Sequence, residues 1–161
     1  MKKSANSNMY EVSLVETWDR FGARLDGAFS CPVLIVSHAP LSDKARHALE
    51  NSVEALGYGS GACAFFVTGP VAEGASPNDL SDTDVFSAVE GLDPLAMVIT
   101  DQASAQACAR AYRCDIPVPD KSRVLGRTVI GFADFESMLA SPEEKQRAWG
   151  LLKRLPGPTR N

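Results

Sequence analysis

The stretch PVLIVSHAP, residues 32–40, joins a continuous apolar run to a short polar loop. The run is rich in β-branched residues and does not alternate with polar ones, which is typical of a strand covered on both faces, as in a parallel sheet. Three further apolar runs follow at residues 62–67, 95–100 and 127–132. The sequence therefore predicts four buried, mainly parallel strands.

Helical patterns separate these runs. Apolar residues recur every three or four positions from Tyr10 to Phe29, which predicts an amphipathic helix. Ser42 and Asp101 are placed to cap the helices after the first and third strands, and Asp134 to cap a short turn. Residues 141–144, Ser-Pro-Glu-Glu, form a capping box with proline at the first helical position. The alternation predicts an α/β fold, a three-layer α/β/α sandwich with a mainly parallel four-stranded sheet.

The length and composition of the chain limit the functions that this protein can have. A chain of 161 residues with 45% hydrophobic and 22% charged residues suits one globular domain, expected over residues 10–161 after a polar tail at residues 1–9. The net charge of -4 excludes a globally basic nucleic-acid binder, so a nucleic-acid partner is not favoured. The apolar runs are too short to span a membrane, and no signal peptide is recognised, so we expect a cytoplasmic protein without a membrane partner.

The cysteines and glycines do not form a recognisable site. Cys31, Cys63, Cys108 and Cys114 include no C-x-x-C pair, and neither histidine completes a metal-binding pattern. We expect free, largely buried thiols, no metal and no cofactor. Residues 57–61, Gly-Tyr-Gly-Ser-Gly, precede a strand instead of following one, so they are read as a helix stop and turn.

In an open α/β sheet, ligands bind beyond the carboxyl ends of the strands. The candidate catalytic residue there is His38, as a general base or an anion-stabilising donor, with Asp101 and Asp134 as orienting carboxylates. The alternative is that both aspartates only cap helices and that His38 only contacts solvent. The remaining polar or loop positions at the strand ends are candidate ligand-binding residues: Ser37, Pro40, Thr68, Gly69, Phe135 and Glu136.

Three stretches resemble the uracil-DNA glycosylase superfamily in its small bacterial and archaeal type. Residues 32–40 are similar to the family's first strand and its Gly-Glu-x-Pro-Gly loop. Residues 89–105 resemble its Leu-x-Pro segment, apolar strand and alanine-containing helix, and residues 138–152 resemble the helix after its His-Pro-Ser motif. The resemblance covers about residues 30–155 and implies a scaffold that flips a base out of the stack.

The functional motifs of that family are replaced here. Its acidic first loop is matched by residues 37–41, Ser-His-Ala-Pro-Leu, which retain only the proline. Its base-reading Asn is matched by Gly69, and its His-Pro-Ser motif by residues 134–136, Asp-Phe-Glu. Acids at that position would repel both a uracil anion and a DNA phosphate. We therefore expect no uracil excision and a binding role instead, for a nucleotide, a nucleic acid or a protein.

Two other functions remain open. One is an active hydrolase or glycosylase of altered specificity that uses His38. The other is a flavodoxin-like small-ligand domain in which the long polar loop Gly69–Thr83 faces the ligand. The C-terminal cations form either a local basic patch or a solvated helix face; they are Lys145, Arg147, Lys153, Arg154 and Arg160.

Overall fold

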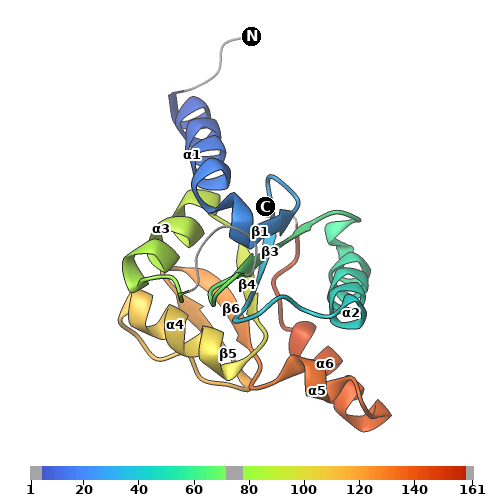
Figure 1. Cartoon of the computed structure of the whole chain (residues 1–161). Coiled ribbons are helices and arrows are strands. Elements are labelled where there is room, and N and C mark those ends of the chain that lie inside the picture. Colours follow the sequence, from blue (N-terminus) through green and yellow to red (C-terminus); the bar gives the residue numbers. More distant parts are fainter. Residues whose placement is uncertain (1–4, 72–77, 159–161) are drawn as a thin grey trace.

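A computed structural model describes residues 5–71 and 78–158 of the chain. It has one six-stranded sheet in the order β1-β3-β2-β4-β6-β5, with helices on both faces (Figure 1). The four inner strands pair in parallel and are buried along their whole length; they are β3 (Cys63–Val67), β2 (Val33–Ser37), β4 (Ala96–Ile99) and β6 (Arg127–Gly131). The prediction of an α/β fold with a mainly parallel sheet is confirmed.

The sheet is wider than predicted. β1 (Leu25–Gly27) adds to β3 at one edge and β5 (Asp120–Val124) adds to β6 at the other, both antiparallel. The prediction of four strands was therefore two strands short. β1 is only three residues long, and β5 has the mostly exposed sequence DKSRV. Edge strands are often short and charged, so they lack the apolar pattern that marks an inner strand.

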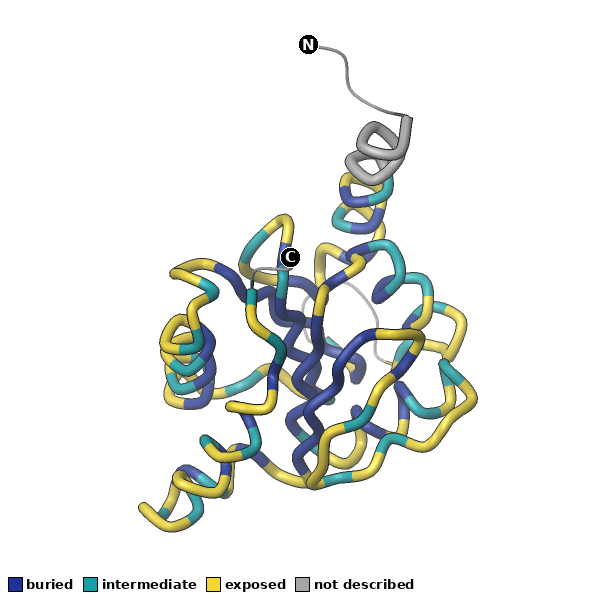
Figure 2. The backbone as a smooth tube through the Cα atoms, turned by 180° about the vertical axis from the view of Figure 1, so that it is seen from behind, coloured by how far each residue is buried: buried dark blue, intermediate teal, exposed yellow. Residues whose placement is uncertain are grey.

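The helices form two layers, one on each face of the sheet. Leu34 and Val36 of β2 face the first layer, whereas Val33 and Ile35 face the second, as expected for alternating side chains. The first layer contains α1 (Ala5–Phe21), α3 (Asp82–Leu92) and α4 (Gln102–Tyr112), and the second contains α2 (Asp43–Val53) with its extension η2 (Glu54–Tyr58), α5 (Phe135–Met138) and α6 (Pro142–Leu152). Figure 2 shows the buried strands between outward-facing, exposed helix surfaces.

The first helix differs from its predicted bounds. α1 runs from Ala5 to Phe21 and is followed by a 3₁₀ turn, η1 (Gly22–Arg24), and by β1, so the prediction of helix up to Phe29 was wrong. Leu25 continues the helical spacing but lies on a strand, opposite Phe66. The helix also includes residues 5–9 of the predicted polar tail, and residues 1–4 lie outside the described part of the chain.

The predicted helix starts are confirmed. Ser42, Asp101, Asp134 and Ser141 each accept a hydrogen bond from the backbone N–H three residues further along, at 2.7 to 3.2 Å. Gly57 has a φ of 100° within η2, a left-handed conformation that glycine adopts without strain and that stops the helix as predicted.

Candidate functional site

The connections of the parallel strands change side between β2 and β4. The helix after β2, α2, covers one face of the sheet, whereas the helix after β4, α4, covers the other. Two loops that diverge in this way leave a crevice at the carboxyl ends of the strands, where ligands of open α/β sheets bind. In this chain His38 and Asp101, which follow β2 and β4 closely, lie at this point of the sheet edge.

The carboxylate of Asp101 spans this crevice. Its Oδ2 accepts a hydrogen bond from the backbone N–H of His38 at 2.9 Å, and its Oδ1 accepts one from the backbone N–H of Ser104 at 2.7 Å. The hydroxyl of Thr100 lies 3.4 Å from Oδ2. Both carboxylate oxygens are thus engaged by the protein, and Asp101 joins the end of β2 to the start of α4.

The imidazole of His38 has a different acidic partner. Its Nε2 lies 3.3 Å from Oδ1 of Asp79, and the two side chains are 40% and 59% exposed, so solvent screens the pair. The backbone of Gly69 lies against the same ring, because a Cβ at position 69 would stand only 2.7 Å from Nε2. The structure therefore pairs His38 with Asp79 and Gly69; its link to Asp101 is through the backbone, not through the imidazole.

The other acids at this edge have structural partners too. The Oδ1 of Asp134 accepts from the backbone N–H of Ser137 at 3.2 Å and caps α5. The carboxylate of Glu136 accepts from the backbone N–H of Ser42 at 2.9 Å and from its hydroxyl at 2.6 Å. Glu136 thereby joins α5 to the start of α2. Asp101 and Asp134 also form an isolated antiparallel bridge, so the loops after β4 and β6 are held together.

Most of the remaining candidate ligand-binding residues have structural roles. Ser37 and Thr68 are buried at the ends of β2 and β3, and the backbone N–H of Thr68 donates to the carbonyl of Ser37 at 2.9 Å. Phe135 is 2% exposed and packs edge-on against Phe132 with ring centroids 5.1 Å apart. Pro40 is exposed in the loop after β2. Phe135 is thus a core residue that fills the space under this edge.

A buried arginine lies near the same edge, and the sequence did not predict its burial. Arg24 is 6% exposed, and its guanidinium donates to the carbonyl oxygens of Val67, Gly69 and Asn78. Burial lowers the pKa of Arg24. These bonds hold the two described ends of the loop between β3 and α3, which was predicted over Gly69–Thr83 but ends where α3 begins at Asp82; its residues 72–77 lie outside the described part of the chain. An arginine after an amphipathic helix is ordinarily a surface residue, so no sequence signal identified it.

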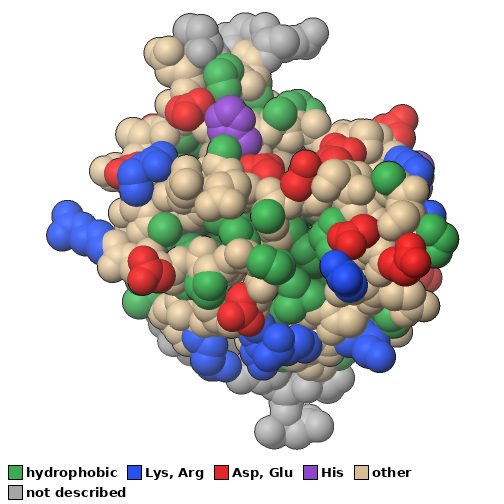
Figure 3. Space-filling view, turned by 90° about the horizontal axis from the view of Figure 1, so that it is seen from below, with side chains coloured by type: hydrophobic (Ala, Val, Ile, Leu, Met, Phe, Trp, Pro, Cys, Tyr) green, Lys and Arg blue, Asp and Glu red, His purple; other side chains and the backbone are tan. Residues whose placement is uncertain are grey.

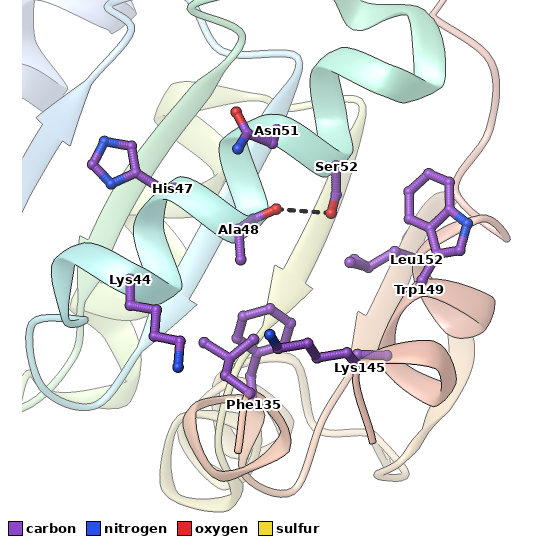
Figure 4. Close-up of a pocket in the computed structure, with 11 residues that line it drawn as sticks. Lys44, His47, Ala48, Asn51, Ser52, Phe135, Lys145, Trp149 and Leu152 are labelled. Atoms are coloured by element: carbon purple, nitrogen blue, oxygen red, sulfur yellow. Dashed lines mark hydrogen bonds between the residues drawn. The ribbon is translucent and has the colours of Figure 1, made fainter. Parts of the chain in front are cut away.

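A pocket opens on the second layer, between α2 and α6, with a volume of about 370 Å³. Its floor is apolar and includes Phe135 and Leu152, while lysines from both helices lie at its rim (Figure 4). The residues that line it are Lys44, His47, Ala48, Asn51, Ser52, Phe135, Leu139, Lys145, Ala148, Trp149 and Leu152. The sequence does not indicate this pocket, because the pocket forms between helices that lie about 90 residues apart in the chain.

Acidic and basic side chains are mixed on one face of the molecule, and most of the cysteines are buried. Figure 3 shows acidic and basic side chains mixed around an apolar area on the face that it displays, and such a mixture does not favour a polyphosphate there. Cys31, Cys63 and Cys108 are buried free thiols, as predicted, whereas Cys114 is exposed. Among the described residues no group of His, Cys, Asp and Glu side chains is arranged to hold a metal ion.

Comparisons with known proteins do not assign this chain to a family. No protein-family model matches the chain, and no curated protein matches it in sequence. Within residues 5–71 and 78–158, none of the helices combines the length and the apolar character that crossing a bilayer requires. The fold defines a class of protein: an α/β fold with a mixed, mostly parallel six-stranded sheet flanked by helices.

Proposed function

We propose that this protein is a non-catalytic binding domain on a scaffold that resembles the uracil-DNA glycosylases and that does not excise uracil. The observation that carries the proposal is the Asp101 carboxylate, whose two oxygens bond the backbone N–H groups of His38 and Ser104 across the crevice. A group that activates water or reads a base must have a free donor or acceptor in the crevice. Both oxygens of Asp101 already accept backbone hydrogen bonds that link two elements, which supports a structural role for this carboxylate.

The charges at this edge support the same proposal. Asp79, Asp101, Asp134 and Glu136 all lie on or beside the loops that follow the parallel strands. Excision of uracil develops negative charge on the leaving base, and donors or cations stabilise that charge in an active site. Four carboxylates would raise the energy of the same transition state and would also repel the phosphates of a DNA substrate.

The direct test is an excision assay with single- and double-stranded oligonucleotides that contain uracil, hypoxanthine or xanthine. We expect no released base above the level of a no-protein control, while an active uracil-DNA glycosylase cleaves the uracil substrate in parallel. Release of any base that disappears in the His38→Ala variant would overturn the proposal. A filter-binding assay at low salt, with the same oligonucleotides, separates a nucleic-acid partner from a small-molecule or protein partner.

A second candidate function rests on the His38–Asp79 pair. A carboxylate 3.3 Å from an imidazole nitrogen can orient the ring, as a general base requires. Hydrolysis of p-nitrophenyl esters or phosphates that is lost in both His38→Ala and Asp79→Asn would support this function.

A flavodoxin-like domain is the third candidate, and the order of the parallel strands favours it. In chain order they run 2-1-3-4 across the sheet, which is the beginning of the flavodoxin-like order 2-1-3-4-5. Titration with flavin mononucleotide tests this candidate, because quenching of flavin fluorescence would report binding at the crevice. Without quenching, the strand order reflects the scaffold alone.

A further inference from the structure

We infer that the pocket between α2 and α6 binds a small anion that carries a flat apolar body, such as a nucleoside monophosphate or an aromatic carboxylate. The inference deepens the proposed function and rests on it, since it gives the binding role a site and a ligand class. The pocket lies on the second helix layer, next to the carboxyl edge at Phe135, and its lining includes neither His38 nor Asp101. It can therefore be tested separately from excision.

The floor of the pocket suits a flat apolar group. Phe135, Ala148 and Leu152 are almost fully buried and give the cavity a packed, apolar base. The indole of Trp149 is half-buried in the wall contributed by α6. Aromatic rings pack well against other flat rings, and a volume of about 370 Å³ is within the range of small-molecule sites.

The rim of the pocket has two lysines without acidic partners. Lys44 on α2 and Lys145 on α6 extend toward the same end of the pocket, beside Phe135 (Figure 4). In the described part of the chain neither ammonium group has a carboxylate within 4.0 Å. Two unpaired positive charges above an apolar floor are complementary to an anion whose body is apolar.

Two other cations on the same helices have acidic partners. Arg46 on α2 pairs with Asp26 at 2.8 Å, and Arg147 on α6 pairs with Glu144 at 3.0 Å. On α2 and α6 the two cations that do not line the pocket are thus paired with carboxylates, whereas the two that line it are not.

Polar groups at the upper rim add directional contacts. The Nδ1–H of His47 donates to the carbonyl of Asp43 at 2.9 Å, which leaves Nε2 for a further hydrogen bond. The amide of Asn51 is exposed beside it and can both donate and accept. The hydroxyl of Ser52 is already used, because it donates to the carbonyl of Ala48 at 2.7 Å. A ligand with ring heteroatoms could therefore be oriented by Asn51 and His47.

The test is isothermal titration of the full chain with AMP, UMP and 2-naphthoate. Uridine serves as the probe without charge and inorganic phosphate as the probe without an apolar body. We expect at least one of the three anions to bind about tenfold tighter than both controls. Binding of the nucleotides but not of 2-naphthoate identifies a nucleotide site, and the reverse identifies a carboxylate site. Equal or absent binding of all five probes overturns the inference.

Matched variants locate the binding site. In the Lys44→Gln/Lys145→Gln variant we expect affinity to fall about fivefold or more, since the variant removes both exposed ion pairs with the anion. In the control variant Lys121→Gln/Lys153→Gln, which removes the same charge from outside the pocket, we expect no change beyond a small screening effect. Equal losses in both variants would show non-specific attraction and would contradict the assigned site.

A spectroscopic readout gives the location independently of affinity. The chain has two tryptophans, and the indole N–H of Trp18 donates to the carbonyl of Phe29 at 2.9 Å, away from the pocket. In a ¹H–¹⁵N spectrum we expect the ligand to shift the indole signal of Trp149 and to leave that of Trp18 in place. If anions bind without moving the Trp149 signal, the pocket is not their site. In that case the proposed absence of excision still stands, because the excision assay alone decides it.

Discussion

The backbone N–H of His38 donates to Oδ2 of Asp101 over 2.9 Å and joins the loops after β2 and β4, two strands that are adjacent in the sheet but 63 residues apart in the chain. The other oxygen of the same carboxylate caps α4. One side chain therefore fixes both sides of the crevice where an open α/β sheet would bind a ligand. Replacing the Asp101 side chain should therefore lower the stability of the fold.

Asp101→Ala should lower the free energy of unfolding by about 2 to 3 kcal/mol, because it removes a helix cap and leaves the His38 N–H without its acceptor. Urea denaturation measures the loss. Asp134→Ala is the matched control, since Asp134 is an exposed cap with a single N–H partner, and it should cost about 1 kcal/mol. Equal losses in the two variants would mean that the bond to His38 contributes nothing.

Gly91→Ala should destabilise the protein even though alanine is the better helix former by about 1 kcal/mol. Gly91 lies in α3 directly against α1, and a Cβ there would overlap the hydroxyl of Thr17 and stand 3.2 Å from its Cβ. Gly150→Ala, in α6 with nothing within 4 Å of the new Cβ, should stabilise the protein. Thermal unfolding compares the two, and a Thr17→Ala/Gly91→Ala variant should recover part of the loss.

Arg127→Lys should lower the free energy of unfolding by about 2 kcal/mol. The buried guanidinium of Arg127 donates to Glu90 at 2.7 Å, to Asp93 at 2.8 Å and to the carbonyl of Pro94 at 2.9 Å. An ammonium group cannot reproduce this fork, and a buried cation that keeps fewer hydrogen-bond partners is costly. Arg123→Lys is the control, because Arg123 is exposed, and it should leave the denaturation midpoint unchanged.

The buried thiols should resist modification in the native protein. Burial raises the pKa of the Cys31 thiol to about 11 and of the Cys63 and Cys108 thiols to about 12, from an ordinary 9.0. At pH 8 a thiol reagent should therefore label only the exposed Cys114 quickly and should label the other three after denaturation. Fast labelling of more than one thiol in native protein would contradict the burial of the others.

The same shifts predict how stability depends on alkaline pH. Above about pH 9 the unfolded chain loses its thiol protons while the folded chain keeps them, so the folded state binds more protons and stability falls as pH rises toward 11 to 12. Each thiol contributes up to about 1.4 kcal/mol per pH unit in this range. Urea midpoints measured from pH 8 to 11 test the slope, which should be smaller in Cys108→Ala.

The inner part of the fold could be predicted because its signals are local. Continuous apolar runs mark strands covered on both faces, and Ser42, Asp101, Asp134 and Ser141 cap helices through the backbone three residues away. The edge strands could not be predicted in this way. β1 and β5 are held by pairing with β3 and β6, and three residues or a charged pentapeptide have no periodicity that indicates such a partner.

The candidate site could be placed at one edge of the sheet, but its internal contacts could not. That His38 and Asp101 follow parallel strands is sufficient to bring them to the same edge. Which atoms meet there depends on the path of the loops. The imidazole of His38 pairs with Asp79 from the loop after β3, and only its backbone reaches Asp101.

The order of residues along this chain therefore determines the parallel strands, the helix caps and the sheet edge where polar groups gather. Each of these features depends on neighbours within a few positions. The burial of Arg24, the closure of the crevice by Asp101 and the pocket between α2 and α6 depend on segments 40 to 100 residues apart. Such contacts arise only when the sheet brings distant segments together, and burial then decides which polar groups bond to one another and which remain open to a ligand.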